Sequence, residues 1–178
     1  MNASLLNDIY LRLRERTKFT PENCQTIFAS RNQPSHIPLT KIGGILFLSG
    51  ISILSKYQEY HIDHIISIVS LQRQLTSETI QHDILPIEDT PQQATVSIFA
   101  ENIDRLLDSI HKSLLEGKRV AVHCQAGVSR SATVVIAYMM KYEGLSLNDA
   151  VEYVSTHRPA ICPNRGFLEM LVSRSNNK

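Results

Sequence analysis

The sequence predicts an α/β fold: a single domain with a central, mostly parallel β-sheet flanked by helices. Short β-branched apolar runs alternate along the chain with longer segments of helical spacing, a pattern typical of parallel strands joined by helices. The 178 residues suit one domain with a sizeable core. We find no internal repeat, low-complexity block or second domain in the sequence.

The first element expected is a short amphipathic helix within residues 5–18. Its apolar residues recur at roughly helical spacing among charged ones: Leu5, Leu6, Ile9 and Leu13. Two interpretations stay open for this helix. It packs on its own domain, or it forms a homodimer or partner contact through residues 1–20. Residues 17–40 contain three prolines and many polar residues, so an extended linker or loop is expected there, with Cys24 as an inert thiol.

The middle of the chain alternates between strand and helix signals. Ile45 to Gly50 is an apolar run ending at a glycine, and His64 to Val69 is rich in β-branched residues, which favours a buried strand. A short helix over 51–60, a polar loop over 72–82 and a third strand over 82–87 are expected around them. Apolar residues at helical spacing then predict a long helix between Val96 and Leu114.

The C-terminal half begins with a strand over 119–123 and, after a loop, a helix from Ala132 to Met140. Gly144 is placed like a helix C-terminal cap. Ser146 and Asp149 resemble a capping box that starts the next helix, which ends at Arg158 before Pro159. A last helix is expected over 166–173.

The loop between strand and helix carries the chemistry. It reads His123-Cys124-Gln125-Ala126-Gly127-Val128-Ser129-Arg130-Ser131. Mostly small residues separate the cysteine from the arginine, so successive backbone N–H groups can point at one anion, with the N-terminus of the next helix behind them. The planar fork of Arg130 matches phosphate oxygens. A cysteine in this positive field loses its proton easily. The pattern predicts phosphate-ester cleavage through a phosphocysteine intermediate.

These residues resemble the His-Cys-x-x-Gly-x-x-Arg-Ser signature of the cysteine-dependent protein tyrosine phosphatases, and the Ser-Arg-Ser ending is similar to that of the dual-specificity subfamily. The resemblance spans roughly residues 40–175. It implies a protein tyrosine phosphatase-like fold, with residues 1–35 as an N-terminal helix and linker extension and residues 36–178 as the catalytic domain. The competing interpretation of Cys124 as a buried structural thiol leaves Gly127 and Arg130 unexplained.

Cleavage also needs a proton donor for the leaving oxygen. Asp83, Glu88 and Asp89 all precede the long helix. The segment Ile87-Glu88-Asp89-Thr90-Pro91 resembles the general-acid loop of dual-specificity phosphatases, which makes Asp89 the first choice and Glu88 the reserve. Asp83 is expected inside or beside a strand. A plain turn or helix-start carboxylate remains the alternative for Asp89.

The resemblance assigns further roles around the loop. Residues Gln125 to Arg130 would bind phosphate, and His123 would support a low thiol pKa. Ser131 would stabilise the departing thiolate, although a helix-start serine is the simpler alternative. Asn164, in a Pro-Asn-x-Gly-Phe-like segment, would hold loops near the site. Cys162 is either an inert thiol or an oxidation partner of Cys124.

The absence of tryptophan and the short length favour a small atypical dual-specificity enzyme over a tyrosine-specific one. Its substrates would be phosphoproteins carrying phosphotyrosine, phosphoserine or phosphothreonine. A phosphoinositide phosphatase and an RNA 5′-triphosphatase remain alternatives, but the loop has no lysine for additional phosphates. A non-catalytic phosphoprotein-binding module is a further alternative, disfavoured because members of that kind usually lack the cysteine.

Composition limits the remaining possibilities. The formal net charge is +1, so no nucleic-acid or anionic membrane partner is expected. The apolar-rich stretch 42–54 is too short to span a bilayer. Three cysteines without disulfide-framework spacing predict a reducing, intracellular setting, cytoplasmic or nuclear. Neither a cofactor nor a metal is expected, since the histidines lack metal-ligand spacing and His61 and His64 have no third ligand nearby. A solvated or loop role is expected for these two histidines.

Overall fold

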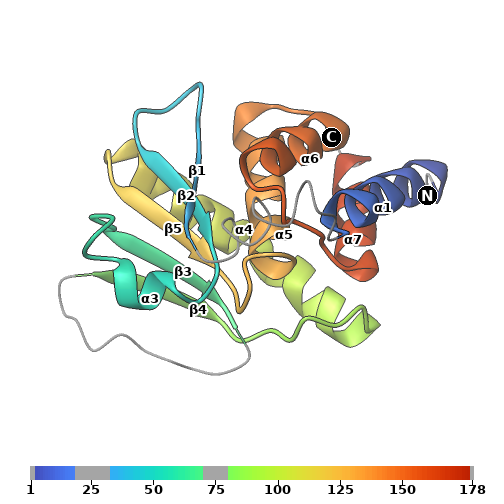
Figure 1. The fold of residues 1–178 in the computed structure, drawn as a ribbon, viewed down its shortest axis with the longest axis horizontal. Helices are drawn as coiled ribbons and strands as arrows, with labels where there is room; N and C mark the ends of the chain where they lie inside the picture. Colours follow the sequence, from blue (N-terminus) through green and yellow to red (C-terminus); the bar gives the residue numbers. More distant parts are fainter. Residues whose placement is uncertain (1–2, 19–32, 70–79, 177–178) are drawn as a thin grey trace.

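The computed structural model describes residues 3–18, 33–69 and 80–176. Their centre is a five-stranded sheet with the order β1-β2-β5-β3-β4 (Figure 1). The strands are β1 (Ser35–Ile37), β2 (Ile45–Ser49), β3 (His64–Ile68), β4 (Gln81–Leu85) and β5 (Arg119–His123). Strands β2, β5, β3 and β4 pair in parallel, and β1 is antiparallel to β2. The predicted mostly parallel sheet is confirmed.

The helices follow the predicted order, with ends displaced by a few residues. They are α1 (Ala3–Thr17), α3 (Ile53–Lys56), α4 (Gln93–Leu115), α5 (Arg130–Tyr138), a π-helix η1 (Met139–Glu143), α6 (Leu147–His157) and α7 (Arg165–Ser175). The helix expected over 51–60 is shorter than predicted. Gly144 ends η1 with a φ of 77°, as the cap prediction requires. The Ser146 side chain accepts a hydrogen bond from the Asp149 backbone, which confirms the predicted cap of α6.

Alternate residues of the strands point to opposite faces of the sheet and build two cores. Phe47, Ile65 and Ala121 pack on the side of α3, with Ile53. The other face contacts α4 and α5, and the larger core on this face also includes residues of α1, α6 and α7. In Figure 1, α4 runs behind the sheet and the other four helices lie to its right. Because both faces are covered, the strands read as continuous apolar runs.

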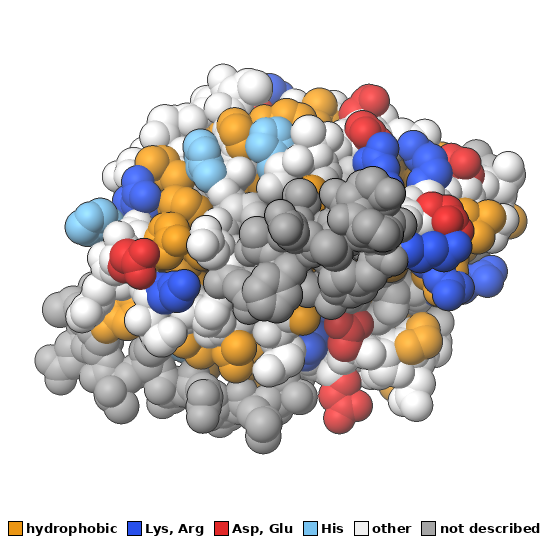
Figure 2. Space-filling view, viewed as in Figure 1, with side chains coloured by type: hydrophobic (Ala, Val, Ile, Leu, Met, Phe, Trp, Pro, Cys, Tyr) orange, Lys and Arg blue, Asp and Glu red, His pale blue; other side chains and the backbone are white. Residues whose placement is uncertain are grey.

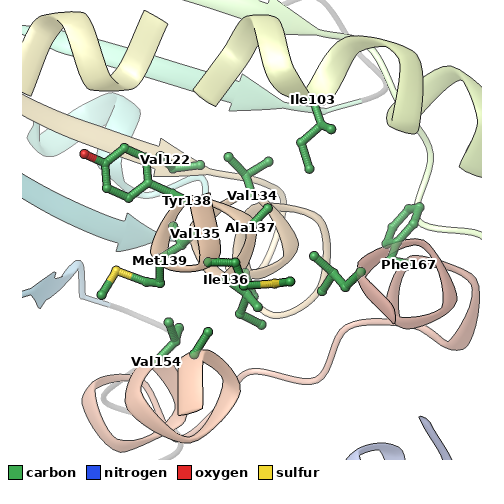
Figure 3. Packing of buried hydrophobic residues seen from close by; sticks show 14 of the residues in the cluster. Ile103, Val122, Val134, Val135, Ile136, Ala137, Tyr138, Met139, Val154 and Phe167 are labelled. Carbon is green, nitrogen blue, oxygen red and sulfur yellow. The ribbon is translucent and has the colours of Figure 1, made fainter. Parts of the chain in front are cut away.

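Helix α5 occupies the middle of the larger core. All nine of its residues are buried. Figure 3 shows its side chains surrounded by Val122 of β5, Ile103 of α4, Val154 of α6 and Phe167 of α7. The end of β5 and the start of α5 are therefore both held by packing, which fixes the two ends of the loop that joins them.

Helix α1 packs against α7. Its apolar residues Leu6, Ile9 and Leu13 are only 1–4% exposed and belong to the larger core. Packing on its own domain, one of the two interpretations of this helix, is therefore what the structure shows. A partner contact through residues 1–20 stays a prediction, and the apolar face of α1 is not available for it. The polar face is charged: Arg16 binds Glu152 of α6 at 2.8 Å, and Figure 2 shows mixed basic and acidic side chains at this end of the molecule.

The expectation of a linker or loop throughout residues 17–40 is wrong at Ser35–Ile37, which form β1. Pro34 and Pro38 flank this strand and produced the error, because prolines usually interrupt strands. At the edge of a sheet they are tolerated, since the outer side of an edge strand needs no ladder hydrogen bonds. Residues 19–32, with Cys24, and residues 72–79 of the predicted 72–82 loop lie outside the described residues.

The end of the helix after the loop was not predicted. Instead of an α-helix to Met140, the chain widens into η1 after Tyr138. Within η1, the buried Glu143 accepts hydrogen bonds from the backbone N–H and, at 2.5 Å, from the hydroxyl of Thr40. A π-bulge is decided by tertiary contacts such as these rather than by local sequence.

Candidate functional site

The loop from Cys124 to Arg130 joins the carboxyl end of β5 to the first turn of α5. Its carbonyl groups are bound from outside. Gln125 O accepts from the Ile51 backbone at 3.1 Å, and Val128 O accepts from the Cys162 backbone at 2.8 Å. Because C=O and N–H of a trans peptide point in opposite directions, the N–H groups that follow these carbonyls face the inside of the loop. An N–H-lined hollow of this kind suits an anion.

Arg158 binds the carbonyl groups of Ala126 and Gly127, between the two described above. Its Nε donates to Gly127 O at 2.7 Å and its Nη2 to Ala126 O at 3.4 Å. Its Nη1 donates to Leu48 O of β2 and to the Ser35 hydroxyl of β1. The side chain is 0% exposed. A buried guanidinium thus fastens the loop to the sheet, and every one of its contacts here is charge-assisted.

Gly127 is required at the turn of the loop. Its φ is +67°, and a Cβ atom there would lie 2.4 Å from Arg158 Nη2 and 2.5 Å from the Ser49 carbonyl. Both the left-handed backbone and the close approach exclude other residues.

Cys124 lies at the base of the loop, and its thiol is within 3.2 Å of the Ser131 hydroxyl. Burial raises the pKa of the Cys124 thiol. Hydrogen bonds from the Ser131 side chain and from the backbone of Ser131 and Val128, together with the positive charge of Arg130, lower the pKa by more. The net pKa lies below the usual thiol value, which favours the nucleophilic thiolate.

Asp89 is brought to the same site from the segment before α4. Its Oδ1 accepts from the Ser129 hydroxyl at 2.7 Å and from Asn164 Nδ2 at 2.9 Å. Its Oδ2 lies 3.5 Å from Arg130 Nε. Three side chains from two parts of the chain, the loop and the start of α7, thus hold one carboxyl group beside the loop. Its side chain is 34% exposed.

Arg130 is oriented by a backbone contact behind it. Its Nη1 donates to Ile87 O at 2.8 Å, and the side chain is 8% exposed. Its buried Nε has no hydrogen-bond partner among the described residues. This Nε faces the Asp89 carboxylate at 3.5 Å, so it is ion-paired without a close hydrogen bond.

Asn164 connects α7 to the site. Its side-chain oxygen caps α7 by accepting from the Phe167 N–H, while its amide reaches Asp89. Its own N–H donates to the Ser129 hydroxyl. Asn164 therefore links the segment that carries Asp89, the loop and the last helix.

Asp83 and Glu88 are the two other carboxylates that the sequence offered as proton donors. Glu88 is exposed, and Asp83 is in β4, as expected. The hydrogen bond from His64 lowers the pKa of Asp83 to about 2, against burial, with a further contribution from Ser109. His64 is 0% exposed and also contacts the Ser113 hydroxyl at 2.8 Å. The solvated or loop role predicted for His64 is therefore wrong, because polar partners on β4 and α4 satisfy it within the core.

His123 lies behind the loop. Its Nδ1 is 3.2 Å from the Cys124 carbonyl. Burial lowers the pKa of His123 to about 4, against the effect of this hydrogen bond, so the ring is neutral at physiological pH.

Arg158 is the site residue that sequence reasoning missed, since it was seen only as a helix end. It lies 31 positions from Gly127, and no local spacing relates the two.

The backbone N–H of Cys162 contacts the loop, and burial raises the pKa of its thiol. Both described cysteines are free thiols. No group of three or more metal-binding side chains occurs among the described residues.

Comparison with known proteins agrees with this geometry. Residues 46–177 match the model of the dual specificity phosphatase catalytic domain. The chain therefore belongs to the dual specificity phosphatase family, and it is a phosphatase of the small atypical type. A putative tyrosine phosphatase of Invertebrate iridescent virus 6 is 37% identical over 133 residues, which cover 75% of this chain and 89% of the viral protein. Human dual specificity protein phosphatase 18 is 34% identical over 144 residues, covering 79% of this chain and 74% of that protein.

Solved structures show the same fold. The human tyrosine phosphatase-like serine/threonine/tyrosine-interacting protein superposes with a TM-score of 0.70 at 30% identity, covering 83% of this chain and 98% of that one. The expected protein tyrosine phosphatase-like fold is confirmed. In the described part of the chain, no helix has both the length and the apolar character needed to span a bilayer.

Proposed function

We propose that this protein phosphatase hydrolyses phosphotyrosine and phosphoserine or phosphothreonine through a phosphocysteine on Cys124. The observation that carries the proposal is the convergence of three groups on one hollow. The Cys124 thiol, with its lowered pKa, lies at the base, the Arg130 guanidinium at the wall, and the Asp89 carboxyl 3.5 Å from Arg130 Nε at the mouth.

In the first step, the Cys124 thiolate attacks phosphorus. The S–P bond forms, the bond to the leaving oxygen breaks, and protonated Asp89 gives its proton to that oxygen. The guanidinium of Arg130 and the inward N–H groups of residues 126–129 stabilise the transferring phosphoryl group.

In the second step, the Asp89 carboxylate takes a proton from water, which attacks phosphorus. The S–P bond breaks, and the Ser131 hydroxyl, 3.2 Å from the sulfur, donates a hydrogen bond to the departing thiolate. Phosphate leaves, and Asp89 is protonated for the next cycle.

The division of the chain into an extension and a catalytic domain at residue 35 remains a proposal. A reducing setting in the cytoplasm or nucleus is also a proposal, and it would keep the thiol active.

The test is turnover of a small aryl phosphate without added metal. Cys124→Ser is expected to abolish turnover, because a hydroxyl at this place is not ionised. Asp89→Asn is expected to lower kcat by about 10²–10⁴-fold. Glu88→Gln is the matched control, since it removes the neighbouring exposed carboxylate, and it should keep wild-type turnover. A large loss in Glu88→Gln with normal Asp89→Asn would move the acid role to Glu88.

Substrate class is decided by parallel assays with phosphotyrosyl and phosphothreonyl peptides, a phosphoinositide and an RNA 5′-triphosphate. Hydrolysis of both peptides, and trapping of a phosphoryl group on Cys124 by rapid acid quench and mass spectrometry, supports the proposal. Preference for either non-protein substrate would overturn the substrate assignment. Peptide binding without turnover by the reduced wild type would instead indicate a binding module.

A further inference from the structure

A chain of hydrogen bonds runs behind the candidate nucleophile through three strands. The Ser67 hydroxyl of β3 lies 2.5 Å from His123 Nε2 of β5 and 2.7 Å from His82 Nε2 of β4. His123 Nδ1 then reaches the Cys124 carbonyl at 3.2 Å. Ser67 and His123 are at most 1% exposed, whereas His82 is partly exposed at the outer end.

The donor and acceptor of every hydrogen bond in this chain follow from the group at its inner end, the Cys124 carbonyl. A carbonyl only accepts, so His123 Nδ1 carries a proton. The ring is neutral, because its pKa is about 4, and its Nε2 must therefore accept. The single hydroxyl proton of Ser67 is consequently given to His123. The Ser67 oxygen is left to accept from His82, whose Nε2 must carry a proton.

We propose that Ser67 and His82 are positioning residues for Cys124, which hold His123 in its Nδ1–H form and thereby keep the Cys124 carbonyl turned away from the site. The inference rests on the proposed role of Cys124 as nucleophile. Without the Ser67 hydroxyl, His123 Nε2 is buried without a partner, and the ring loses the contact that fixes its orientation toward the Cys124 carbonyl. Without the His82 donor, the Ser67 hydroxyl can accept instead of donate, and His123 can take its Nε2–H form, in which Nδ1 no longer donates to Cys124.

The effect reaches the thiol through geometry. The groups that lower the pKa of Cys124 act over hydrogen-bond distances from Ser131 and Val128, so a small rotation of the Cys124 peptide weakens them. The charged and titratable groups facing His123 are His82 of β4 and Arg130 of α5. Those facing His82 are Asp83 and His64.

The test measures the ionisation of Cys124 directly, from the pH dependence of alkylation by iodoacetamide, followed by mass spectrometry of the Cys124 peptide. Ser67→Ala is expected to shift the profile to higher pH, with alkylation on the order of tenfold slower on its acid side. Ser113→Ala is the matched control. It removes a buried hydroxyl from another Ser–His pair, with His64, and its profile should coincide with that of the wild type.

A second pair of variants tests the inference in case Ser67→Ala does not fold. His82→Ala removes the donor to Ser67 and is expected to shift the profile in the same direction, while His82→Gln, whose amide can donate to Ser67, restores it. Profiles of Ser67→Ala or His82→Ala that match the wild type would overturn the inference. So would an equal shift in Ser113→Ala. Failure of the proposed function is seen separately, as turnover that survives in Cys124→Ser.

Discussion

At the scale of single residues, the site depends on a few positions where neighbouring atoms make close contacts. Gly127 combines a positive φ with atoms of Arg158 and Ser49 against its α-carbon. Asp89 and Ser129 form the contact that joins the acid segment to the loop. Close contacts, rather than apolar burial, determine which residue fits at each of these positions. Even a small change of side chain there should therefore affect activity.

Substitution of glycine tests this directly. Gly127→Ala is expected to lower the free energy of unfolding by more than the ~1–2 kcal/mol of a left-handed alanine, because the new methyl group also meets the Ser49 backbone at 2.5 Å. Gly117→Ala is the control, since Gly117 has a φ of +75° with nothing within 4 Å. Urea unfolding and kcat/KM measure the pair. Equal stability losses, or normal turnover in Gly127→Ala, would contradict the prediction.

At the scale of elements, the site is assembled where separate segments meet the β5–α5 loop. Helix α5 is held in the core on every side, and α7 reaches the site through Asn164 at its N-terminus. The C-terminal residue of α6 is followed by Arg158, whose guanidinium binds β1, β2 and the loop together. This side chain is the main link between the sheet and the loop.

Arg158→Met should therefore be severely destabilising. It leaves buried carbonyl groups without their charged donor, and a loss of at least about 3 kcal/mol is expected. Arg158→Lys should recover only part of this, because one ammonium group cannot span the same acceptors. Arg12→Met is the control, since that arginine is 42% exposed in a surface ion pair worth at most about 1 kcal/mol. Chemical denaturation measures all three, and similar losses in Arg158→Met and Arg12→Met would refute the assigned role.

At the scale of the whole molecule, the N-terminal helix is part of the same core as Cys124, α5 and α7. Leu13 is 2% exposed and Leu11, on the opposite face of α1, is 49% exposed. Because α1 lies on α7 and α7 carries Asn164 to the site, we expect loss of this packing to affect the position of Asp89.

Leu13→Ala is expected to cost about 2–5 kcal/mol, as buried leucines do, and to lower the temperature at which activity is lost. Leu11→Ala should change stability by no more than about 0.5 kcal/mol. Calorimetry should show a single unfolding transition in both variants. Turnover, assayed over the same temperatures, should be lost at that transition. Separate unfolding of α1 at a temperature that leaves activity intact would contradict the coupling. Light scattering on Leu11→Ala and the wild type additionally tests the predicted partner contact.

Much of the fold could be read from local pattern. Strands β2, β3 and β5 follow from continuous apolar runs, because both faces of the sheet are buried. The long helix α4 follows from apolar periodicity, because one of its faces is buried. The Cys124 to Ser131 loop could also be located, since its chemistry lies in consecutive residues. Asp89 could be proposed only by resemblance, because no spacing connects a carboxylate to a loop 35 or more residues away.

The sequence by itself determined the α/β class, the order of the elements and the residues of the loop, since each depends on neighbours along the chain. Tertiary structure alone decided that Ser35–Ile37 become an edge strand, that His64 is buried with Asp83, and that Arg158 and Ser67 lie behind the loop. These outcomes depend on hydrogen-bond partners far apart in sequence. A polar side chain reveals nothing of such a partner until the sheet and its helices have closed around it.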